Sequence, residues 1–218
     1  MALINYDPPT SPYLDILHRD EDLLVLNKQA GLLSVPGKAA EHKDCLQSRV
    51  QRVFPSATVV HRLDMATSGV IIFALNKAAH VSVSQQLEKR QTSKRYFARV
   101  FGVPSEQKGI IDLPLICDWP NRPKQKIDHE HGKASQTHWQ VIDHDAHSSL
   151  IELTPITGRS HQLRVHMVAL GHPILGDRLY AHEHALALSP RLCLHAYSHQ
   201  ITHPASGRAI EFSCEISF

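Results

Sequence analysis

The feature that most constrains the fold is an uninterrupted apolar run, GVIIFAL, at residues 69–75. The run is far too short to cross a bilayer, and its β-branched side chains favour a buried strand. The polar stretch DMATS precedes it, and Asn76 follows it at the position of a helix N-cap. The sequence therefore predicts a buried strand that starts at a polar loop and leads into a helix ending near Gln91.

Other strand patterns recur along the chain, and few helix patterns separate them. We expect a hairpin over residues 13–27 and further strands over residues 57–60, 95–102, 109–116, 135–142, 149–155, 192–196 and 208–213. Two more helices are predicted, one over residues 44–53 with Asp44 as N-cap and one with Ser160 as N-cap. This succession is typical of the α+β class, with a mixed, largely antiparallel sheet flanked by helices. The length fits one domain of ordinary size or at most two small ones, and we expect a single domain, residues 1–218.

The composition excludes several classes of protein. Hydrophobic residues make up 42% of the chain and charged residues 20%, which is typical of a globular protein. The N-terminal stretch MALINYDPPTSPYLD has no basic segment ahead of an apolar one, so we expect no signal peptide and no membrane partner. The four cysteines form no CxxC pair, which suits free thiols in the cytoplasm. The 17 histidines lack the spacing and third ligand of a zinc site, so we expect surface histidines and no metal.

Positive charge is concentrated in two stretches, EKRQTSKRYFAR at residues 88–99 and NRPKQK at residues 121–126. A chain with basic stretches of this kind can bind a polyanion. Taken alone, either stretch is more often a solvated face of the protein. The basic stretches alone therefore do not establish polyanion binding, and the motifs with candidate catalytic residues must be considered with them.

Three stretches contain candidate catalytic or anion-binding residues. HRLDMATSG, residues 61–69, holds a single carboxylate, Asp64, which taken alone could simply cap the turn. KRYFARV, residues 94–100, offers Tyr96 from a strand. ITGRSHQLRVHM, residues 156–167, places polar side chains in the first turns of a helix: Arg159, His161, Gln162, Arg164 and His166. Because a helix N-terminus already attracts anions, this last group predicts a site for phosphate or for a catalytic carboxylate.

On these stretches the chain resembles the RluA family of RNA pseudouridine synthases, over nearly its whole length. The family's other motifs match GHPILGD at residues 171–177, RLCLHA at residues 191–196 and NKQAGLLSVPG at residues 27–37. One departure is Gln29, where the family usually has proline, and it falls in a loop. CDWPNRPKQK followed by GKASQT is similar to the members that modify both 23S ribosomal RNA and the anticodon arm of tRNA. The resemblance implies the pseudouridine synthase fold, with a catalytic cleft across the sheet, and structured RNA as the partner.

Carried over residue by residue, the resemblance implies a role for four side chains. Asp64 is the catalytic carboxylate, which either abstracts a ribose proton or attacks C1′. Arg164 is its ion-pair partner, and Tyr96 stacks on the uracil and can transfer a proton. Arg62 fills the space that the flipped base leaves in the RNA, where a flat guanidinium can stack. Because the reaction has no redox step, the resemblance implies no cofactor and no metal.

The same resemblance implies the remaining substrate contacts. His61 and Thr67 lie in the HRLDMATSG block, and Leu194 forms part of an apolar wall. No RNA-binding domain of the S4 type precedes the catalytic domain in this sequence, so RNA binding falls to the catalytic domain itself. The outer RNA contacts are assigned to Arg122, Lys124, Lys126 and Lys133. We expect a monomer that works in the cytoplasm.

Two other classes of function, a metal-dependent or hydrolytic enzyme and a non-catalytic RNA-binding module, are less consistent with the sequence. A metal-dependent or hydrolytic enzyme would need a second carboxylate or a ligand triad at short spacing, and the sequence offers neither. A non-catalytic RNA-binding module has no need of Asp64 or Tyr96. Within the synthase family, action on only one of the two RNA classes stays open.

Overall fold

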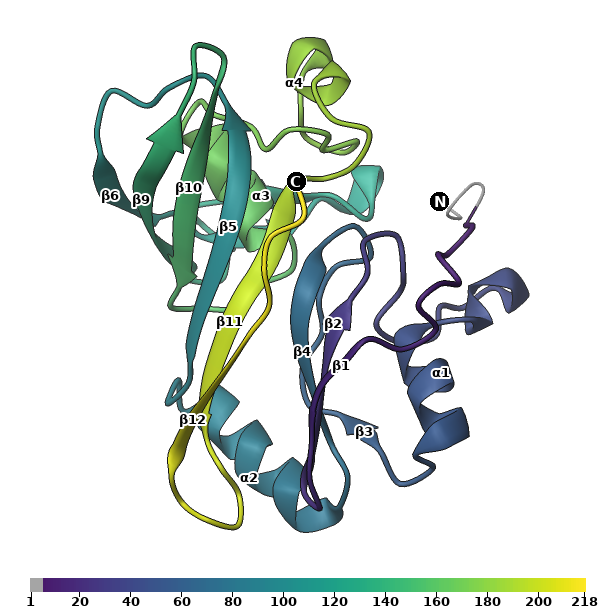
Figure 1. The fold of residues 1–218 in the computed structure, drawn as a ribbon. Coiled ribbons are helices and arrows are strands. Elements are labelled where there is room, and N and C mark those ends of the chain that lie inside the picture. The colour runs from purple at the N-terminus through teal and green to yellow at the C-terminus, as the bar shows by residue number, and fades with distance from the viewer. Residues whose placement is uncertain (1–5) are drawn as a thin grey trace. The chain divides into compact units, whose positions relative to one another are not determined.

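The computed structural model describes residues 6–218, which form two compact units (Figure 1). We name each unit after a residue that it contains. The Asp64 unit comprises residues 6–94 and 196–217, and the Arg164 unit comprises residues 95–195 and Phe218. That residues 1–218 act as one catalytic domain stays a prediction.

The Asp64 unit is built on strands in the order β1-β2-β4-β11, with β12 paired to β11 and β3 paired to β4. These strands are β1 (Ile16–Arg19), β2 (Leu23–Lys28), β3 (Thr58–Val59), β4 (Ser68–Ala74), β11 (Leu194–Thr202) and β12 (Ala209–Ser213). Its helices are the 3-10 turn η1 (Ala40–Lys43), α1 (Leu46–Val53) and α2 (Lys77–Glu88). The first two residues of β11 belong to the Arg164 unit.

Strand β4 is the centre of the Asp64 unit, because every one of its residues is buried. It packs with β2, β11, β12 and α2 in one apolar cluster, formed by Leu23, Val25, Val70, Ile72, Val83, Ile201 and Phe212. Asn76 caps α2 by accepting a hydrogen bond from the Ala79 N–H at 2.9 Å. The predicted buried strand, followed by a helix that Asn76 caps, is thus confirmed.

The Arg164 unit contains four antiparallel strands in the order β5-β10-β9-β6 and a short hairpin, β7-β8. The strands are β5 (Ser93–Phe101), β6 (Lys108–Asp112), β7 (Leu115–Cys117), β8 (Gln125–Ile127), β9 (Gln136–His144) and β10 (Ser148–Pro155). Its helices are the 3-10 turn η2 (Trp119–Asn121), α3 (Gln162–Ala169) and α4 (Glu183–Ala187). Strand β5 begins with two residues of the Asp64 unit.

Helix α3 covers one face of the β9 strand. The Nδ1 atom of His166 lies 2.9 Å from Thr137 Oγ1 on β9, and the Gln162 amide donates to the same hydroxyl at 3.0 Å. Thr137, Trp139 and Val141 share the buried side of the strand. The helix is therefore attached to the sheet by polar groups as well as by apolar packing.

The predicted α+β class with a largely antiparallel sheet is confirmed, but two helix starts were placed one residue early. Cys45 is the N-cap of α1, because the Asp44 carboxylate accepts two hydrogen bonds from Arg49 instead, at 2.8 and 2.7 Å. His161 is the N-cap of α3, because it adopts a left-handed φ of 55° and helical geometry begins only after it. The strand expected over residues 109–116 is two strands, separated at residues 113–114, where Pro114 interrupts the ladder.

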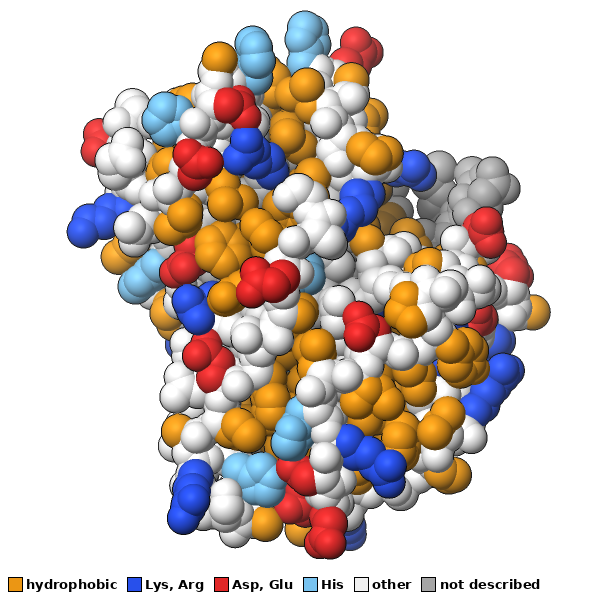
Figure 2. All heavy atoms as spheres, in the orientation of Figure 1, with side chains coloured by type: hydrophobic (Ala, Val, Ile, Leu, Met, Phe, Trp, Pro, Cys, Tyr) orange, Lys and Arg blue, Asp and Glu red, His pale blue; other side chains and the backbone are white. Residues whose placement is uncertain are grey.

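The surface is mixed in character. In Figure 2, basic, acidic and apolar side chains are interspersed on the visible face. None of the helices within residues 6–218 is both long and apolar enough to cross a membrane. All four cysteines are free thiols, as predicted.

Candidate active site

The polar loop ahead of β4 presents Asp64. The Asp64 carbonyl accepts a hydrogen bond from the Thr67 N–H at 3.1 Å, which closes a turn directly before the strand. Leu63 and Thr67 are buried on either side of Asp64, whereas Asp64 is partly exposed and Arg62 is exposed. The turn therefore fixes the backbone of Asp64, a residue that is itself only partly exposed.

A buried lysine, Lys28, is hydrogen-bonded to the backbone of this turn. Lys28, at the end of β2, has no exposed surface, and its Nζ donates to the carbonyls of Gln29, Leu32 and Met65 at 2.8, 2.7 and 3.0 Å. The Met65 carbonyl also accepts the Gly31 N–H at 2.9 Å. Lys28 thereby ties the NKQAGLLSVPG stretch to the residue that follows Asp64.

The pKa of Lys28 lies close to neutral pH. Burial lowers the pKa of Lys28 to about 7, and the nearby Asp64 carboxylate opposes this shift. The carboxylate and the buried ammonium are thus electrostatically coupled. Sequence analysis missed Lys28, although it belongs to the quoted NKQAGLLSVPG motif.

The same loop holds the Asp64 segment at a second point. The Ser34 hydroxyl donates to the Leu63 carbonyl at 2.7 Å and accepts the Leu63 N–H at 3.1 Å. Both residues are buried. Asp64 is therefore held on both sides, through the backbones of Leu63 and Met65.

Gly69 allows β4 to approach β11 closely. A Cβ atom there would lie 2.3 Å from the Ala196 carbonyl oxygen, and the φ of Gly69 is +113°. Both the space and the backbone conformation require glycine at this position. This explains the glycine that ends the HRLDMATSG block.

The predicted substrate residue His61 has a structural contact. Its Nε2 accepts the Ile72 backbone N–H at 3.1 Å, so the ring completes the hydrogen bonding of β4 beyond the end of β3. Its ring meets His199 edge-on, with centroids 4.9 Å apart. Burial, reinforced by the charge of Lys94, lowers the pKa of His61 to about 3, so the ring is neutral at physiological pH.

In the Arg164 unit, the guanidinium of Arg164 pairs with Asp177. Arg164 Nε and Nη2 donate to the two carboxylate oxygens at 2.8 and 2.6 Å, and the side chains are only 5% and 1% exposed. Gly176 places Asp177 there: a Cβ at Gly176 would lie 1.9 Å from the Arg191 carbonyl oxygen. Sequence analysis missed Asp177, because the acid lies 13 residues beyond Arg164, in the GHPILGD loop.

Tyr180 extends this buried pair toward the β7-β8 hairpin. The Asp177 carboxylate accepts the backbone N–H groups of Leu179 and Tyr180 at 2.9 and 3.2 Å. The Tyr180 hydroxyl lies 2.7 Å from His161 Nδ1 and accepts the Gln125 N–H at 2.7 Å. One connected network thus positions the helix α3 arginine and the first residue of β8.

Tyr96 and Leu194 occupy the same unit. Tyr96 pairs with Leu153 across the β5-β10 ladder, so its side chain lies on the face that α3 covers. Leu194 is 2% exposed, and the preceding Cys193 carbonyl accepts the Arg99 N–H of β5 at 3.0 Å. Both residues are therefore fixed by the sheet rather than by loops.

The phosphate site considered at the start of α3 is not formed by most of the residues expected there. Gln162 and His166 are buried, and both bond to Thr137. Burial lowers the pKa of His166, which keeps the imidazole neutral. Only Arg159 of this group is exposed.

The four predicted outer contacts lie on or beside the β7-β8 hairpin. Arg122 and Lys124 belong to its loop, Lys126 lies on β8, and the Lys133 backbone bridges to Leu115. Arg122, Lys126 and Lys133 are exposed, and Lys124 is half-buried. Their placement on one supersecondary unit is consistent with a common binding surface.

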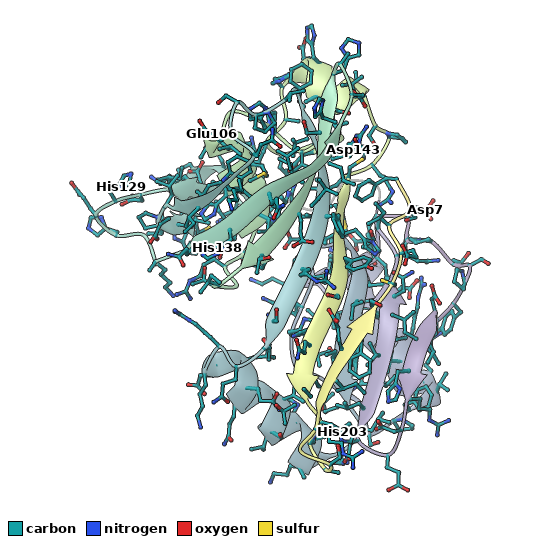
Figure 3. The ribbon with its side chains drawn as sticks, turned by 60° about the vertical axis from the view of Figure 1, so that its left-hand side comes forward. Asp7, Glu106, His129, His138, Asp143 and His203 are labelled. Carbon is teal, nitrogen blue, oxygen red and sulfur yellow. The ribbon has the colours of Figure 1, made fainter. Side chains whose placement is uncertain are left out.

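The described residues include one side-chain group with the spacing of a metal site: Asp20, Asp22 and His203. His203, at the β11-β12 turn (Figure 3), has Nδ1 3.3 and 3.2 Å from the backbone N–H groups of residues 205 and 206. Its proton therefore lies on Nε2, which points at Asp20 Oδ2 at 3.1 Å. Burial raises the pKa of Asp20, but hydrogen bonds from His18 and from backbone N–H groups hold it well below its usual value. In this structure His203 and Asp20 thus form a histidine–carboxylate contact.

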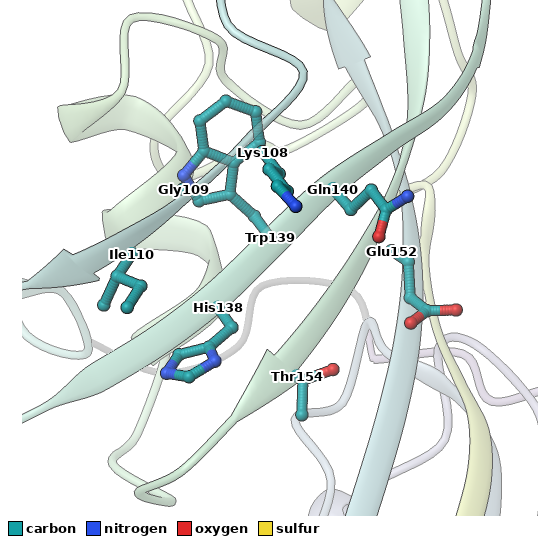
Figure 4. Close-up of a pocket in the computed structure, with 8 residues that line it drawn as sticks. All are labelled: Lys108, Gly109, Ile110, His138, Trp139, Gln140, Glu152 and Thr154. Atoms are coloured by element: carbon teal, nitrogen blue, oxygen red, sulfur yellow. The ribbon is translucent and has the colours of Figure 1, made fainter.

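A shallow hollow of about 460 Å³ lies on the open face of the β6-β9-β10 sheet (Figure 4). Its lining residues are Lys108, Gly109, Ile110, His138, Trp139, Gln140, Glu152 and Thr154. None of them is a predicted site residue. The hollow therefore plays no part in the candidate active site.

The structure thus sorts the predicted residues into two sets. Asp64, Arg62, His61 and Thr67 share one loop in the Asp64 unit. Those in the Arg164 unit are Tyr96, Arg164, Leu194, Arg122, Lys124, Lys126 and Lys133. The ion pair expected between Asp64 and Arg164 stays a prediction.

Comparison with known proteins gives a consistent result. The sequence profile of the family described as RNA pseudouridylate synthase matches residues 22–169. The chain is 55% identical, over 100% of both chains, to "Dual-specificity RNA pseudouridine synthase RluA" of Escherichia coli (strain K12). It is 56% identical to the protein of the same name from Salmonella typhimurium, again over the whole of both chains. The solved structure "Human RNA Pseudouridylate Synthase Domain Containing 1" matches with a TM-score of 0.80 and 31% identity, covering 96% of this chain and 86% of that one.

Proposed function

Because the chain belongs to the RNA pseudouridylate synthase family, we propose that it converts uridine to pseudouridine in two classes of RNA, 23S ribosomal RNA and the anticodon arm of tRNA. One observation carries the dual specificity: the identity of 55% to a dual-specificity enzyme extends over the full length of both chains. The stretch CDWPNRPKQK, which sequence analysis associates with such enzymes, lies in the β7-β8 hairpin. Action on only one of the two RNA classes is the alternative.

The reaction is an isomerisation. The bond between ribose C1′ and uracil N1 breaks, the base rotates, and a bond forms between C1′ and C5. The proton on C5 then leaves and N1 gains one, so atoms balance without any redox step. A single carboxylate can drive this by attacking C1′ or by removing a ribose proton, and we assign that role to Asp64.

The contacts of Asp64 support the assignment. Its backbone is held by Ser34 and Lys28 through the neighbouring carbonyls, while the residue as a whole stays partly exposed. A carboxylate that only capped a turn would not need this support. Preorganisation of this kind is what a reacting group requires.

Arg164 and Tyr96 are the other residues that we assign to the reaction. Arg164 is the ion-pair partner that we assign to Asp64, and Asp177 orients the guanidinium. Tyr96 stacks on the uracil, and its hydroxyl can transfer a proton once the base is detached. Leu194 contributes an apolar wall.

Arg62 acts on the RNA rather than on the reacting bond. A base in a stem-loop must leave its stack before its sugar can be reached, which costs a few kcal/mol. Arg62 is exposed and lies two residues from Asp64, and its planar guanidinium can stack in the space that the base leaves. We propose further that the protein works as a monomeric, single catalytic domain in the cytoplasm.

The direct test is to incubate the purified protein with unmodified 23S ribosomal RNA and tRNA transcripts and to map pseudouridine in each. We expect modification of both RNAs. Pseudouridine in one class only would support the narrower alternative. RNA binding without any pseudouridine would mean a non-catalytic binding protein.

A further inference from the structure

The β7-β8 hairpin presents a large aromatic side chain that the proposed roles leave unused. Trp119 is 65% exposed, whereas the other tryptophan, Trp139, is 6% exposed. The guanidinium of Arg122 lies over the Trp119 ring, 4.4 Å from its centroid. One face of the indole is thus covered by a planar cation, which is a stabilising arrangement in itself. Much of the rest of the ring faces solvent.

The segment that carries Trp119 is held by local hydrogen bonds. The Asp118 N–H donates to the Lys124 carbonyl at 2.9 Å, and the Lys124 N–H donates to the Asn121 carbonyl at 3.1 Å. The Asn121 side-chain amide donates to the Asp118 carboxylate at 2.9 Å. The tryptophan therefore projects from a fixed turn.

This turn is also connected to the candidate active site. The residue after Lys124, Gln125, donates its N–H to the Tyr180 hydroxyl, and the Arg164 guanidinium lies over the Tyr180 ring, 5.1 Å from its centroid. A ligand group bound by Trp119 would thus be held at a fixed position relative to Arg164. Both residues belong to the same unit.

The charges around Trp119 favour an anionic ligand. Lys124 lies in the same turn, Lys126 lies on β8, the Lys133 backbone bridges to Leu115 at the start of β7, and Arg122 stacks on the indole. Three acids oppose them: Asp118 is bonded to Asn121, Asp128 faces the Lys126 ammonium at 3.8 Å, and Glu130 lies exposed in the turn after β8. An aromatic ring among cations is the combination that binds single-stranded nucleic acid, where bases stack and phosphates meet the cations.

Resting on the proposed function, we propose that Trp119 is a stacking platform for an unpaired base in the loop of the substrate RNA, with Arg122 supporting its other face. The ligand is a splayed-out nucleobase, because bases inside an A-form helix are already stacked on each other. Trp119 therefore recognises a loop base other than the one that is isomerised. Hairpin loops of ribosomal RNA and tRNA both offer such a base, which provides a common feature for dual recognition.

The test measures binding of a tRNA anticodon stem-loop by filter binding at several salt concentrations. Trp119→Ala should weaken binding by about five- to a hundred-fold, the loss of one stacked base, and should leave the salt slope unchanged. Lys124→Ala should instead flatten the salt slope by roughly 0.7 to 0.9, as expected for a lost phosphate contact. Trp119→Phe, which keeps a stacking face, should recover most of the affinity. Ile110→Ala, at another exposed apolar residue of the same unit (61% exposed), is the matched control and should bind normally.

Two further measurements separate stacking from a structural effect. In a Trp139→Phe background, RNA should quench the fluorescence of Trp119, and an abasic nucleotide at one loop position should abolish the quenching. That same abasic RNA should bind wild type and Trp119→Ala equally. Normal binding by Trp119→Ala, or unchanged quenching by every abasic RNA, would overturn the platform. Pseudouridine formation by the wild type tests the proposed function separately, since it can persist when the platform is absent.

Discussion

The Asp177 carboxylate binds the Arg164 guanidinium through two hydrogen bonds, at 2.8 and 2.6 Å, where both side chains are almost fully buried. Removing such a partner from a buried guanidinium costs several kcal/mol, because an uncompensated charge is left behind. The pair belongs to one network with Tyr180 and His161, so it fixes the orientation of the arginine before any substrate binds. Asp177 is therefore a positioning residue for the arginine that we assign to the reaction.

Asp177→Asn should destabilise the fold, because it removes the charge that compensates Arg164. We expect a loss of about 3 to 5 kcal/mol in the free energy of unfolding, measured by urea denaturation at pH 7. The control is Glu152→Gln, since Glu152 forms a surface pair with Arg95 at 3.8 Å. That change should cost less than about 1 kcal/mol. Equal losses in the two variants would contradict the structural role of the buried pair.

Lys28 should make stability depend on pH. Its pKa is about 7 in the folded protein and near 10.5 in the unfolded chain, so between these values the unfolded state binds more protons. The free energy of unfolding should therefore rise with pH across this window, by up to about 1.4 kcal/mol per unit, and this contribution should be flat below pH 7. Subtracting the profile of Lys28→Met from that of the wild type isolates the effect. A difference that stays flat from pH 7 to 9 would show that Lys28 keeps its ordinary pKa.

Tyr96→Phe and Tyr96→Leu should differ if the hydroxyl transfers a proton. Phenylalanine keeps the stacking face, so RNA should still bind, but the reaction should stall after the C1′–N1 bond breaks. Leucine loses both functions and should bind the target nucleotide more weakly. Single-turnover assays with RNA containing 5-fluorouridine would reveal an accumulated adduct in the phenylalanine variant. Full activity of Tyr96→Phe would reduce the role of Tyr96 to stacking.

Arg62→Ala should impair the enzyme mainly on structured RNA. Flipping a base out of a stem-loop costs a few kcal/mol, and an unstructured strand does not impose this cost. We therefore expect a larger fall in kcat/KM on a stem-loop than on an unstructured oligonucleotide with the same target. Arg62→Lys, which keeps the charge but not the planar group, should recover only part of the difference. Equal losses on both substrates would rule out the space-filling role.

The sequence predicted the elements whose signals are local. Strand β4 follows from an apolar run, and the start of α2 follows from Asn76, whose carboxamide caps the helix as expected. The start of α3 depends on a left-handed backbone at His161, which propensity does not predict. Likewise Asp44 is a good cap by residue type, but Arg49 on the next turn competes for its carboxylate.

The candidate site was predicted only in part, because several of its contacts join residues that are far apart in the sequence. Asp64 stands out because it is the single carboxylate of a polar turn that leads directly into an apolar strand. Asp177 and Lys28 act through contacts that only the fold creates, with Arg164 in one case and with the Met65 carbonyl, 37 residues away, in the other. The sequence also did not reveal that Gln162 and His166 are buried, because their hydrogen-bond partner Thr137 lies 25 and 29 residues away along the chain.

The central claim is that Asp64 performs the chemistry, and Asp64→Asn tests it most directly. The substitution is nearly isosteric, so the turn and RNA binding should be preserved, while the nucleophile or base is lost. Its activity is measured as tritium release from RNA labelled at uracil C5, because that hydrogen leaves when C5 bonds to C1′. RNA affinity is measured in parallel, and Asp22→Asn, in a turn of the same unit, is the control. The account predicts a loss of activity above roughly a thousandfold, or about 4 kcal/mol of barrier, with RNA affinity nearly unchanged. A variant that binds RNA normally and keeps a tenth of the wild-type rate would contradict it.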